Sequence, residues 1–344
     1  MRHSATDQIF FAVNNFKQAV SISPDVCLYR KTYQYHFITL DIHTNDSCVL
    51  ENLDNFLDPK NISITQSSIQ IRFYLNRELK AHLPYRYQFL CQGWEGSETL
   101  YRSSMGSRLA DVSVDPENKI VHATIFDGEN LPWDQIIGYV FLNPLRLILA
   151  LHNWFHLHAS VVSQNGRGII ISGPSGVGKS TLALTLAMNG FHLFTDDVCF
   201  FQWASPEIKL LGFPKRVLLK TSVLERFKSL NGHYSGKLFH DGKVGLPFHL
   251  FSGNKPVDSL KSEVIIFPEY QEGGPLTLKE MSADEAAGKL MKESGFGYFN
   301  PTLRKLAVDH FSAVRGLVRQ TKIFRLLYHD GELNQFPVLI KSLL

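Results

Sequence analysis

The chain has 344 residues, of which 44% are hydrophobic and 19% are charged, and its formal net charge is +3. These values predict a soluble globular protein of about two domains and exclude a largely disordered chain. A net charge this close to zero indicates neither a nucleic-acid partner nor a membrane-surface partner.

Four cysteines are spaced far apart, with no C-x-x-C pair: Cys27, Cys48, Cys91 and Cys199. This spacing favours free thiols over a zinc site or a disulfide framework, and it fits a reducing, cytoplasmic location. The amino-terminal residues also lack the apolar core of a secretory signal.

Residues 1–130 are predicted to form a smaller, β-rich N-terminal domain. β-branched and aromatic residues gather in Tyr35–Ile42, Ile62–Leu75 and Lys119–Phe126, and turn-forming residues separate these segments. A helical period is present only near Asp7–Val20, and no residue pattern in this domain indicates chemistry.

Residues 131–344 are predicted to form an α/β domain. It opens with a helix at Trp133–Leu151, whose apolar run is interrupted by Pro144 and Arg146 and is too short to span a bilayer. Two strands follow, at Ala159–Ser163 and Gly168–Ser172. The Asn-Gly pair between them favours a tight hairpin turn.

The remaining elements of this domain alternate between helices and strands. A helix is predicted at Lys179–Asn189 and a strand at His192–Phe201. Shorter strands are predicted at Arg216–Lys220, Glu263–Phe267 and Ile323–Leu327. Two further helices are predicted at Ala283–Glu293 and Leu303–Thr321. The segment Ser229–Pro247 is rich in Gly, Lys, Ser and His, so we expect a mobile loop there, either a linker or a lid.

A glycine-rich loop lies between the predicted hairpin and the helix that follows it. Its residues match the Walker A pattern G-x-x-x-x-G-K-[ST]: Gly173, Pro174, Ser175, Gly176, Val177, Gly178, Lys179, Ser180 and Thr181. Glycines let backbone N–H groups turn inward around an anion, and the following helix directs its positive end at the phosphates. We therefore expect Lys179 to contact the phosphates of ATP and the Ser180 hydroxyl to bind Mg²⁺.

Two adjacent carboxylates, Asp196 and Asp197, lie 17 and 18 residues after Lys179, within the predicted strand. Adjacent side chains on a strand point to opposite faces, so the two are expected to differ in role. One carboxylate can bind Mg²⁺, and the other can accept the proton of an attacking hydroxyl, as in kinases. A polar turn at a strand end is the alternative explanation.

The stretch from His158 to Asp197 resembles the catalytic core of the HPr kinase/phosphorylase family and its HPr-kinase-like relatives. The residues that carry the likeness are HASVV, the loop GPSGVGKST and the run LFTDDV, with His158 placed 21 residues before Lys179. The clear likeness covers about Trp154–Phe201. It implies an HPr-kinase-like P-loop fold for the C-terminal domain, ATP and Mg²⁺ as cofactors, and a homo-oligomer.

The resemblance also implies a role for each residue. Asp196 would be the base that activates a serine hydroxyl, with His158 as its partner and Lys179 as a further catalytic residue. Asp197 and Ser180 would lie on the magnesium side.

A second cation beside Lys179 is expected, because negative charge on the moving phosphoryl group must be neutralised. The candidates are Lys215, Arg216 and Lys220. A solvated strand face is the alternative explanation for these three.

Two departures from the bacterial HPr enzymes bear on the acceptor. Thr181 stands where those enzymes usually have Glu, and residues 211–216 replace their downstream substrate-capturing signature. The likeness is closer to divergent HPr-kinase-like proteins, some of which phosphorylate a serine of a ribosomal peptide such as a lasso-peptide precursor. The expected acceptor is therefore a serine-containing peptide or protein, or a small-molecule alcohol, and the N-terminal domain is the candidate for recognising it.

Two other functions fit the same loop. A nucleotide-hydrolysing NTPase is disfavoured because the chain has no L-S-G-G-Q signature, no complete N-K-x-D tetrad and no hhhh-D-E pattern. A nucleotide-sensing binding protein would keep the loop without turnover. Both remain alternatives to the kinase.

Overall fold

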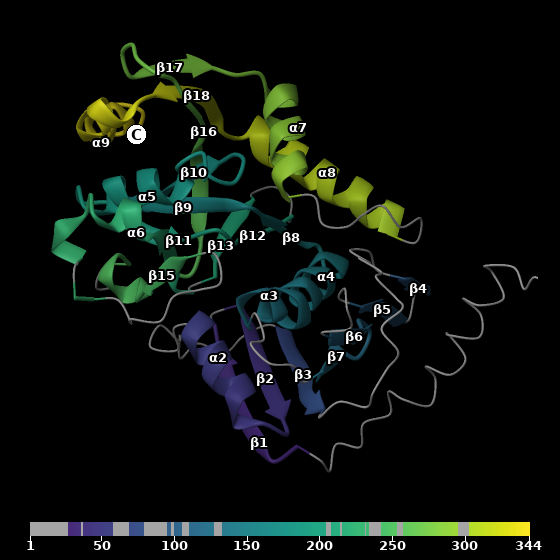
Figure 1. Cartoon of the computed structure of the whole chain (residues 1–344). Helices are drawn as coiled ribbons and strands as arrows, with labels where there is room; N and C mark the ends of the chain where they lie inside the picture. The colour runs from purple at the N-terminus through teal and green to yellow at the C-terminus, as the bar shows by residue number, and fades with distance from the viewer. Residues whose placement is uncertain are drawn as a thin grey trace, which may run out of the picture.

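The computed structural model describes residues 27–35, 37–57, 69–78, 95–97, 100–104, 110–126, 133–203, 208–213, 215–230, 232–233, 242–252, 257–294 and 303–344. The fold is mixed α/β, with a β-rich N-terminal sheet and a second sheet that carries the glycine-rich loop (Figure 1). The predicted helix near Asp7–Val20 lies outside the described residues, as does Cys91.

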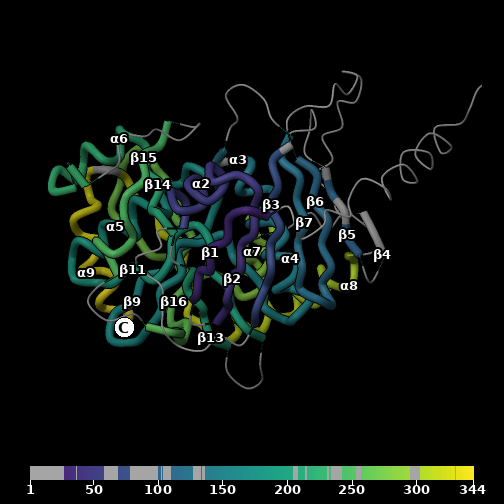
Figure 2. The backbone as a smooth tube through the Cα atoms, turned by 90° about the horizontal axis from the view of Figure 1, so that it is seen from below, coloured from purple at the N-terminus to yellow at the C-terminus, as the bar shows by residue number. Residues whose placement is uncertain are grey.

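The N-terminal sheet contains seven strands within the described ranges (Figure 2). In spatial order they are β1 (Tyr29–Gln34), β2 (Ile38–Thr44), β3 (Ile69–Glu78), β7 (Ile120–Phe126), β6 (Ala110–Asp115), β5 (Leu100–Ser104) and β4 (Glu95–Ser97). The prediction of a strand at Lys119–Phe126 is confirmed by β7. The prediction at Tyr35–Ile42 is wrong in its first residues, because a bond from the Tyr35 N–H to the Ile38 carbonyl closes a turn between β1 and β2.

Helix α2 (Ser47–Leu57) is not among the elements predicted for the β-rich N-terminal domain. The Asp46 carboxylate accepts a bond of 2.9 Å from the Cys48 N–H, which satisfies one of the free donors at the start of the helix. Its buried residues Val49, Leu53 and Phe56 recur at helical spacing and pack into the core.

A nearly continuous helix links the two sheets and confirms the prediction at Trp133–Leu151. It consists of α3 (Trp133–Ile137), a π-helical segment (Gly138–Leu142) and α4 (Asn143–Leu151). These helices lie between the N-terminal sheet and the second sheet (Figure 1). Their apolar side chains belong to one buried cluster that also contains residues of both sheets.

The second sheet contains nine strands in the described part of the chain. They are β8 (Trp154–Leu157), β9 (Ala159–Gln164), β10 (Arg167–Ser172), β11 (His192–Thr195), β12 (Cys199–Gln202), β13 (Lys209–Gly212), β16 (Leu260–Tyr270), β17 (Thr277–Glu280) and β18 (Lys322–Tyr328). The order is β11-β9-β10-β16-β13-β12-β8, with β18 paired to β16 and β17 paired to β18. Strands β10, β16 and β18 are parallel, so their carboxyl ends meet at one edge.

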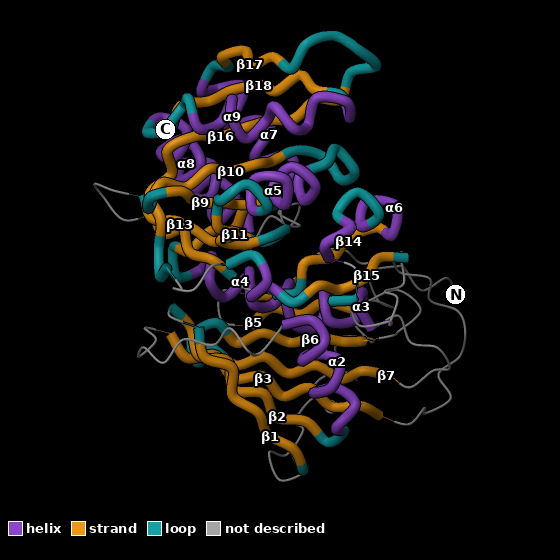
Figure 3. The backbone as a smooth tube through the Cα atoms, turned by 90° about the vertical axis from the view of Figure 1, so that its left-hand side faces the viewer, coloured by secondary structure: helices purple, strands orange, loops and turns teal. Residues whose placement is uncertain are grey.

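Helices cover both faces of the second sheet (Figure 3). They are α5 (Lys179–Ala187), α7 (Ala283–Ser294), α8 (Arg304–Arg319) and α9 (Phe336–Lys341). Apolar residues of α5 and α9 share one buried cluster with Ile169 and Ile171 of β10, whereas Ile170 joins the cluster that contains α7 and α8. Successive side chains of β10 therefore point into two different buried clusters, as in a strand that is buried on both faces. The chain enters the glycine-rich loop at the carboxyl end of β10.

A separate two-stranded sheet pairs β14 (Val217–Lys220) with β15 (Lys243–Leu246), and the short helix α6 (Thr221–Leu224) follows β14. The strand predicted at Arg216–Lys220 is thereby confirmed. The predicted loop Ser229–Pro247 is wrong at its end, because Lys243–Leu246 is a strand. Residues 231 and 234–241 of that loop lie outside the described residues.

Aromatic contacts join the N-terminal sheet to the second sheet. The centre of the Phe37 ring lies 5.3 Å from the ring centre of Trp154 and 5.9 Å from that of Phe200. The ring centres of Tyr35 and Phe213 are 4.9 Å apart. All of these rings are buried. The junction is therefore a packed core rather than a hinge between separate bodies.

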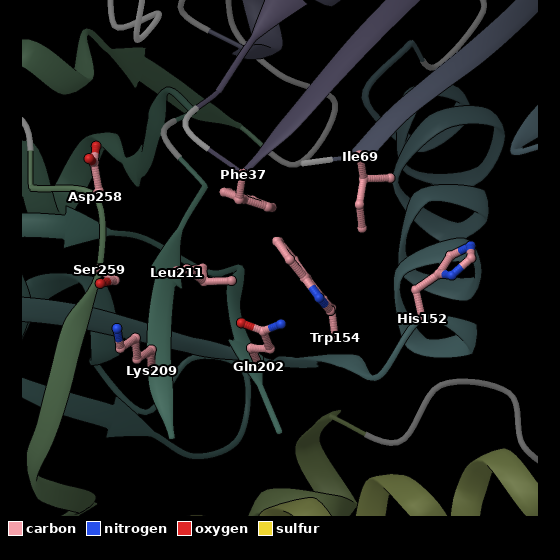
Figure 4. A pocket seen from close by; sticks show the side chains of 9 residues that line it. All are labelled: Phe37, Ile69, His152, Trp154, Gln202, Lys209, Leu211, Asp258 and Ser259. Atoms are coloured by element: carbon pink, nitrogen blue, oxygen red, sulfur yellow. The ribbon is translucent and has the colours of Figure 1, made fainter. Parts of the chain in front are cut away.

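A pocket of about 540 Å³ opens beside this junction, between Phe37, Trp154 and Lys209 (Figure 4). It also borders Asp258 and Ser259, which directly precede β16. Because β16 and β10 are parallel, the pocket lies at the edge of the sheet opposite the glycine-rich loop. No helix in the described residues is long and apolar enough to cross a membrane.

We expect Phe213→Ala to lower the free energy of unfolding by about 3–5 kcal/mol, because the fully buried ring leaves a cavity between the sheets. Urea unfolding followed by circular dichroism measures this loss. Trp203→Ala, at a side chain that is 42% exposed, is the control and should lose much less. A loss below about 1 kcal/mol for Phe213→Ala would contradict a shared core.

Candidate functional site

The glycine-rich loop turns between the end of β10 at Ser172 and the start of α5 at Lys179. Its three glycines have positive φ angles: Gly173 at 154°, Gly176 at 85° and Gly178 at 91°. Side chains disfavour these conformations, so glycine is what allows the backbone N–H groups to curve toward one centre. The arrangement is that of an anion-binding loop at a helix amino-terminus.

Tyr328, at the carboxyl end of β18, contacts the backbone of this loop. Its hydroxyl donates a bond of 2.7 Å to the Val177 carbonyl. A Cβ atom added at Gly178 would lie 2.3 Å from the Tyr328 oxygen. Gly178 is therefore required both by its backbone conformation and by the close approach of Tyr328.

The Lys179 ammonium lies over the loop and is almost fully buried. It donates bonds of 2.7 Å to the Gly173 carbonyl and 3.1 Å to the Pro174 carbonyl. Desolvation lowers the pKa of Lys179, whereas Asp197 and, more weakly, Asp196 raise it. The Lys179 ammonium therefore lies where it could neutralise a phosphate bound by the loop N–H groups.

Asp196 is buried, with 2% of its surface exposed, and it accepts bonds from two hydroxyl groups. The Ser160 hydroxyl donates at 2.6 Å, and the Ser180 hydroxyl donates at 2.9 Å. Ser180 lies in the first turn of α5, directly after Lys179. The carboxylate is thus held beside the position where phosphates would bind.

The Ser180 hydroxyl and the Asp196 carboxylate form an oxygen donor set that fits Mg²⁺. Mg²⁺ takes few protein ligands and completes its coordination with phosphate oxygens and water. Within the described ranges no cluster of three or more His, Cys, Asp or Glu side chains could hold a metal. Ser180 and Asp196 therefore suit a metal ion that is also coordinated by nucleotide phosphates.

Asp197 points to a different set of partners. His158 Nε2 lies 2.9 Å from Asp197 Oδ1, and Lys215 Nζ lies 3.5 Å from Oδ2. Desolvation raises the pKa of this carboxyl, but Lys215, His158 and Arg146 together hold it well below its usual value. With 46% of its side chain exposed, Asp197 is an ionised carboxylate that solvent or a substrate can reach.

A backbone kink separates the two carboxylates. The predicted strand His192–Phe201 is wrong in being continuous, because β11 ends at Thr195 and β12 begins at Cys199. Asp197 has φ of 69°, and the Val198 N–H bonds to the Asp196 carbonyl at 2.8 Å. A left-handed conformation at a residue other than glycine costs about 1–3 kcal/mol and tends to persist at functional sites.

His158 is positioned by the bend between β8 and β9 and by helix α7. Its backbone N–H donates to the Ser294 hydroxyl at 2.8 Å, at the end of α7. This bond fixes the backbone from which the imidazole reaches Asp197.

Lys215 is 1% exposed and belongs to the connection between β13 and β14. Its ammonium lies 5.5 Å from the centre of the Phe56 ring, and the Arg216 N–H donates to the Phe56 carbonyl at 3.0 Å. The end of α2, from the N-terminal sheet, therefore forms part of the wall of the site.

The side-chain contacts reverse the pairing implied by the resemblance, while the roles of the two carboxylates stay predictions. His158 contacts Asp197 and not Asp196, and Ser180 bonds to Asp196 and not Asp197. The kink explains the reversal, because it turns Asp197 toward Lys215 and leaves Asp196 facing α5. Of the three candidate cations, Lys215 reaches a carboxylate, while Lys220 is exposed at the end of β14. The Arg216 Nε atom is buried, with no hydrogen-bond partner among the described residues.

Several residues of the site are absent from the predictions made on the sequence. Ser160 and Arg146 carry local signals, since each is a polar residue within an apolar strand or helix. Phe56, Ser294 and Tyr328 carry none, because each reaches the site from a distant part of the chain.

Comparisons with known proteins identify the same segment. The family model described as HPr Serine kinase C-terminal domain matches residues 150–221. An HPr kinase/phosphorylase of Mycoplasmopsis pulmonis is 29% identical over 145 residues, which cover 36% of this chain and 47% of that protein. An HPr kinase/phosphorylase of Treponema pallidum is 48% identical over 58 residues, 16% of this chain and 18% of that one.

A solved structure, described as the Hpr(Ser) kinase/phosphatase from Coxiella burnetii, matches with a TM-score of 0.28 and 15% identity. That match covers 55% of this chain and 92% of the other. The chain spans less than half the length of the curated relatives it matches. Residues 150–221, which include the glycine-rich loop and both carboxylates, match the HPr serine kinase C-terminal domain family, and part of the chain is distantly similar to HPr kinase/phosphorylases.

Proposed function

We propose that the protein is a Mg²⁺- and ATP-dependent kinase that transfers the γ-phosphoryl group to a hydroxyl, that of a serine in a peptide or protein. The observation that carries this proposal is the division of the two carboxylates around one loop. Asp196 lies with Ser180 beside the loop, and Asp197 lies with His158 and Lys215 where an acceptor can approach. The family match of residues 150–221 supports the same reaction class.

Nucleotide binding would use the loop and α5. Backbone N–H groups of the loop face the phosphates, and Lys179 exchanges its bonds to Gly173 and Pro174 for bonds to phosphate oxygens. Ser180 and Asp196 would hold Mg²⁺, which neutralises charge on the phosphates when bound. Ser160 donates to Asp196 Oδ1, the oxygen that also accepts from Ser180, and so orients the carboxylate.

Proton transfer is the part we assign to Asp197. The acceptor hydroxyl donates a hydrogen bond to this ionised carboxylate, and its proton moves to Asp197 as the new O–P bond forms. The bond between the γ-phosphorus and the bridging oxygen breaks, and ADP leaves with the electron pair. His158 keeps the carboxylate in position through its Nε2 atom.

The low pKa of Asp197 fits this role when the phosphates are considered. A triphosphate brings negative charge close to the carboxylate and to Lys215, and nearby negative charge raises a carboxyl pKa. Asp197 is therefore ionised before the nucleotide binds and becomes a stronger base once it has bound. Lys215 is the cation placed to compensate charge on the moving phosphoryl group.

The acceptor is best matched to a peptide or protein serine. The base is 46% exposed, and the N-terminal sheet forms one wall of the site through α2. A small-molecule alcohol is the other acceptor class to be tested. A homo-oligomer, implied by the family resemblance, remains a prediction.

The first test is phosphoryl transfer from γ-labelled ATP to serine-containing peptides, with the same peptides carrying Ser→Ala as controls. Label is expected on the serine peptides only. Phosphate release that needs no acceptor would instead support a hydrolysing NTPase. Tight ATP binding without transfer or release would support a nucleotide sensor.

We expect Asp197→Asn and Asp196→Asn to separate the two roles. Asp197→Asn should lose about 10²–10⁴-fold in transfer rate with ATP affinity unchanged, because only the proton acceptor is removed. Asp196→Asn should raise the Mg²⁺ concentration needed for half-maximal rate. Titration calorimetry and initial rates at varied Mg²⁺ measure both. Wild-type turnover in Asp197→Asn would remove it as the base.

Removing the Lys215 charge should change the pH dependence of kcat/KM. Asp197 must be ionised to act, and Lys215 keeps its pKa low, so activity in the wild type should persist to low pH. In Lys215→Met the Asp197 pKa rises, and the acid limb of the profile should move to higher pH. Lys220→Met, at an exposed lysine, is the matched control. An unmoved acid limb in Lys215→Met would show that Lys215 does not set the ionisation of the base.

A further inference from the structure

The topology of the second sheet restricts where the nucleoside part of ATP can lie. On one side of β10 stand β9 and β11, followed by the kink that carries Asp196 and Asp197. Metal and acceptor occupy that side in the proposed function. On the other side stand β16 and β18, whose carboxyl ends reach the same edge as the loop. Ligands of open α/β sheets bind outside the carboxyl ends of the strands, so the nucleoside has this second side available.

Two tyrosines end these strands in register. Tyr270 of β16 pairs with Tyr328 of β18, and the Gln271 N–H donates to the Tyr328 carbonyl at 2.9 Å. Val264, Ile266 and Leu326 belong to the buried cluster beneath α5. Side chains alternate along a strand, so Tyr270 and Tyr328 project toward that same face.

Tyr328 links this pair directly to the phosphate loop. Its hydroxyl bonds to the Val177 carbonyl, and its ring is almost completely buried. The Tyr270 ring packs against it at 5.8 Å between centres and 87° between planes. An edge-to-face pair of this kind holds the outer ring in place.

Tyr270 is 58% exposed, although Tyr328 beside it is 6% exposed. Exposure of one aromatic ring alone indicates nothing. Here the exposed ring is anchored through Tyr328 to the loop that holds the phosphates, one strand away from β10. Strand β16 itself runs close to the loop, since a Cβ atom added at Gly173 would lie 3.9 Å from Pro268.

We propose that Tyr270 is the stacking platform for the purine base of the nucleoside triphosphate. The inference rests on the proposed function, because it takes the triphosphate to be held by the loop and the acceptor to approach from the Asp197 side. A tyrosine ring offers a flat apolar face with few rotatable bonds. Stacking is tolerant of base identity because every base has a π-face. Tyr270 therefore contributes affinity for purine nucleotides without choosing between ATP and GTP.

The test compares ligands with and without a base. We would measure Kd for ATP, GTP and inorganic tripolyphosphate, each with Mg²⁺, by titration calorimetry on the full chain. Tyr270→Ala should weaken ATP and GTP about tenfold, a typical loss for one stacked base, and leave tripolyphosphate within about twofold. Tyr270→Phe keeps the ring and should bind all three as the wild type does. Phe311→Ala, at a 41% exposed ring on α8, is the matched control and should change none of them.

Two results would contradict the proposal that Tyr270 stacks on the purine base. One is unchanged ATP and GTP affinity in Tyr270→Ala. The other is an equal loss for tripolyphosphate, which would show that the substitution disturbs the loop through Tyr328. Failure of the kinase proposal would look different, because the wild type would then bind ATP with the same dependence on Tyr270 and transfer no phosphate to any serine peptide.

Discussion

The left-handed backbone at Asp197 is the constraint on which the rest of the site depends. It ends β11 and gives two adjacent carboxylates two different surroundings. Asp196 is buried against hydroxyl groups of Ser160 and Ser180, while Asp197 meets His158 and Lys215. A straight strand would place the two side chains on opposite faces of the sheet, and one of them would face the core on the far side. The kink keeps both at the carboxyl edge, so the metal ligand and the base of the proposed reaction would lie in one site.

The site is also a junction between the two sheets. Phe56 of α2 lies against the Lys215 ammonium, and its carbonyl accepts the Arg216 N–H. A buried ammonium needs polar or π partners to offset its lost hydration, and Asp197 and Phe56 are two such partners of Lys215. The N-terminal part of the chain thus contacts Lys215, the cation beside Asp197, through Phe56. A displacement of α2 would therefore change the surroundings of Lys215 and, through it, of Asp197.

The order of strands around β10 separates the two halves of the proposed reaction. Carboxylates and the histidine lie toward β9 and β11, and the tyrosine pair lies toward β16 and β18. The glycine-rich loop follows β10 and stands between them. This division explains why Tyr328 contacts the loop backbone rather than a catalytic group. Residues 150–221, which match the family model, contain the loop and the carboxylates but neither tyrosine.

The sequence alone determined the phosphate loop, the helix that follows it and the presence of a histidine and two carboxylates beside it, because local spacing encodes these features. It also predicted the hairpin of β9 and β10 and the helices α7 and α8 from periodicity. Which carboxylate meets His158 was decided only by the tertiary structure, since it depends on the φ angle of Asp197 and on the position of Lys215. The contributions of Phe56, Ser294 and Tyr328 were likewise invisible, because each lies far along the chain from the residue it contacts, and such contacts arise only from how the sheets and helices pack.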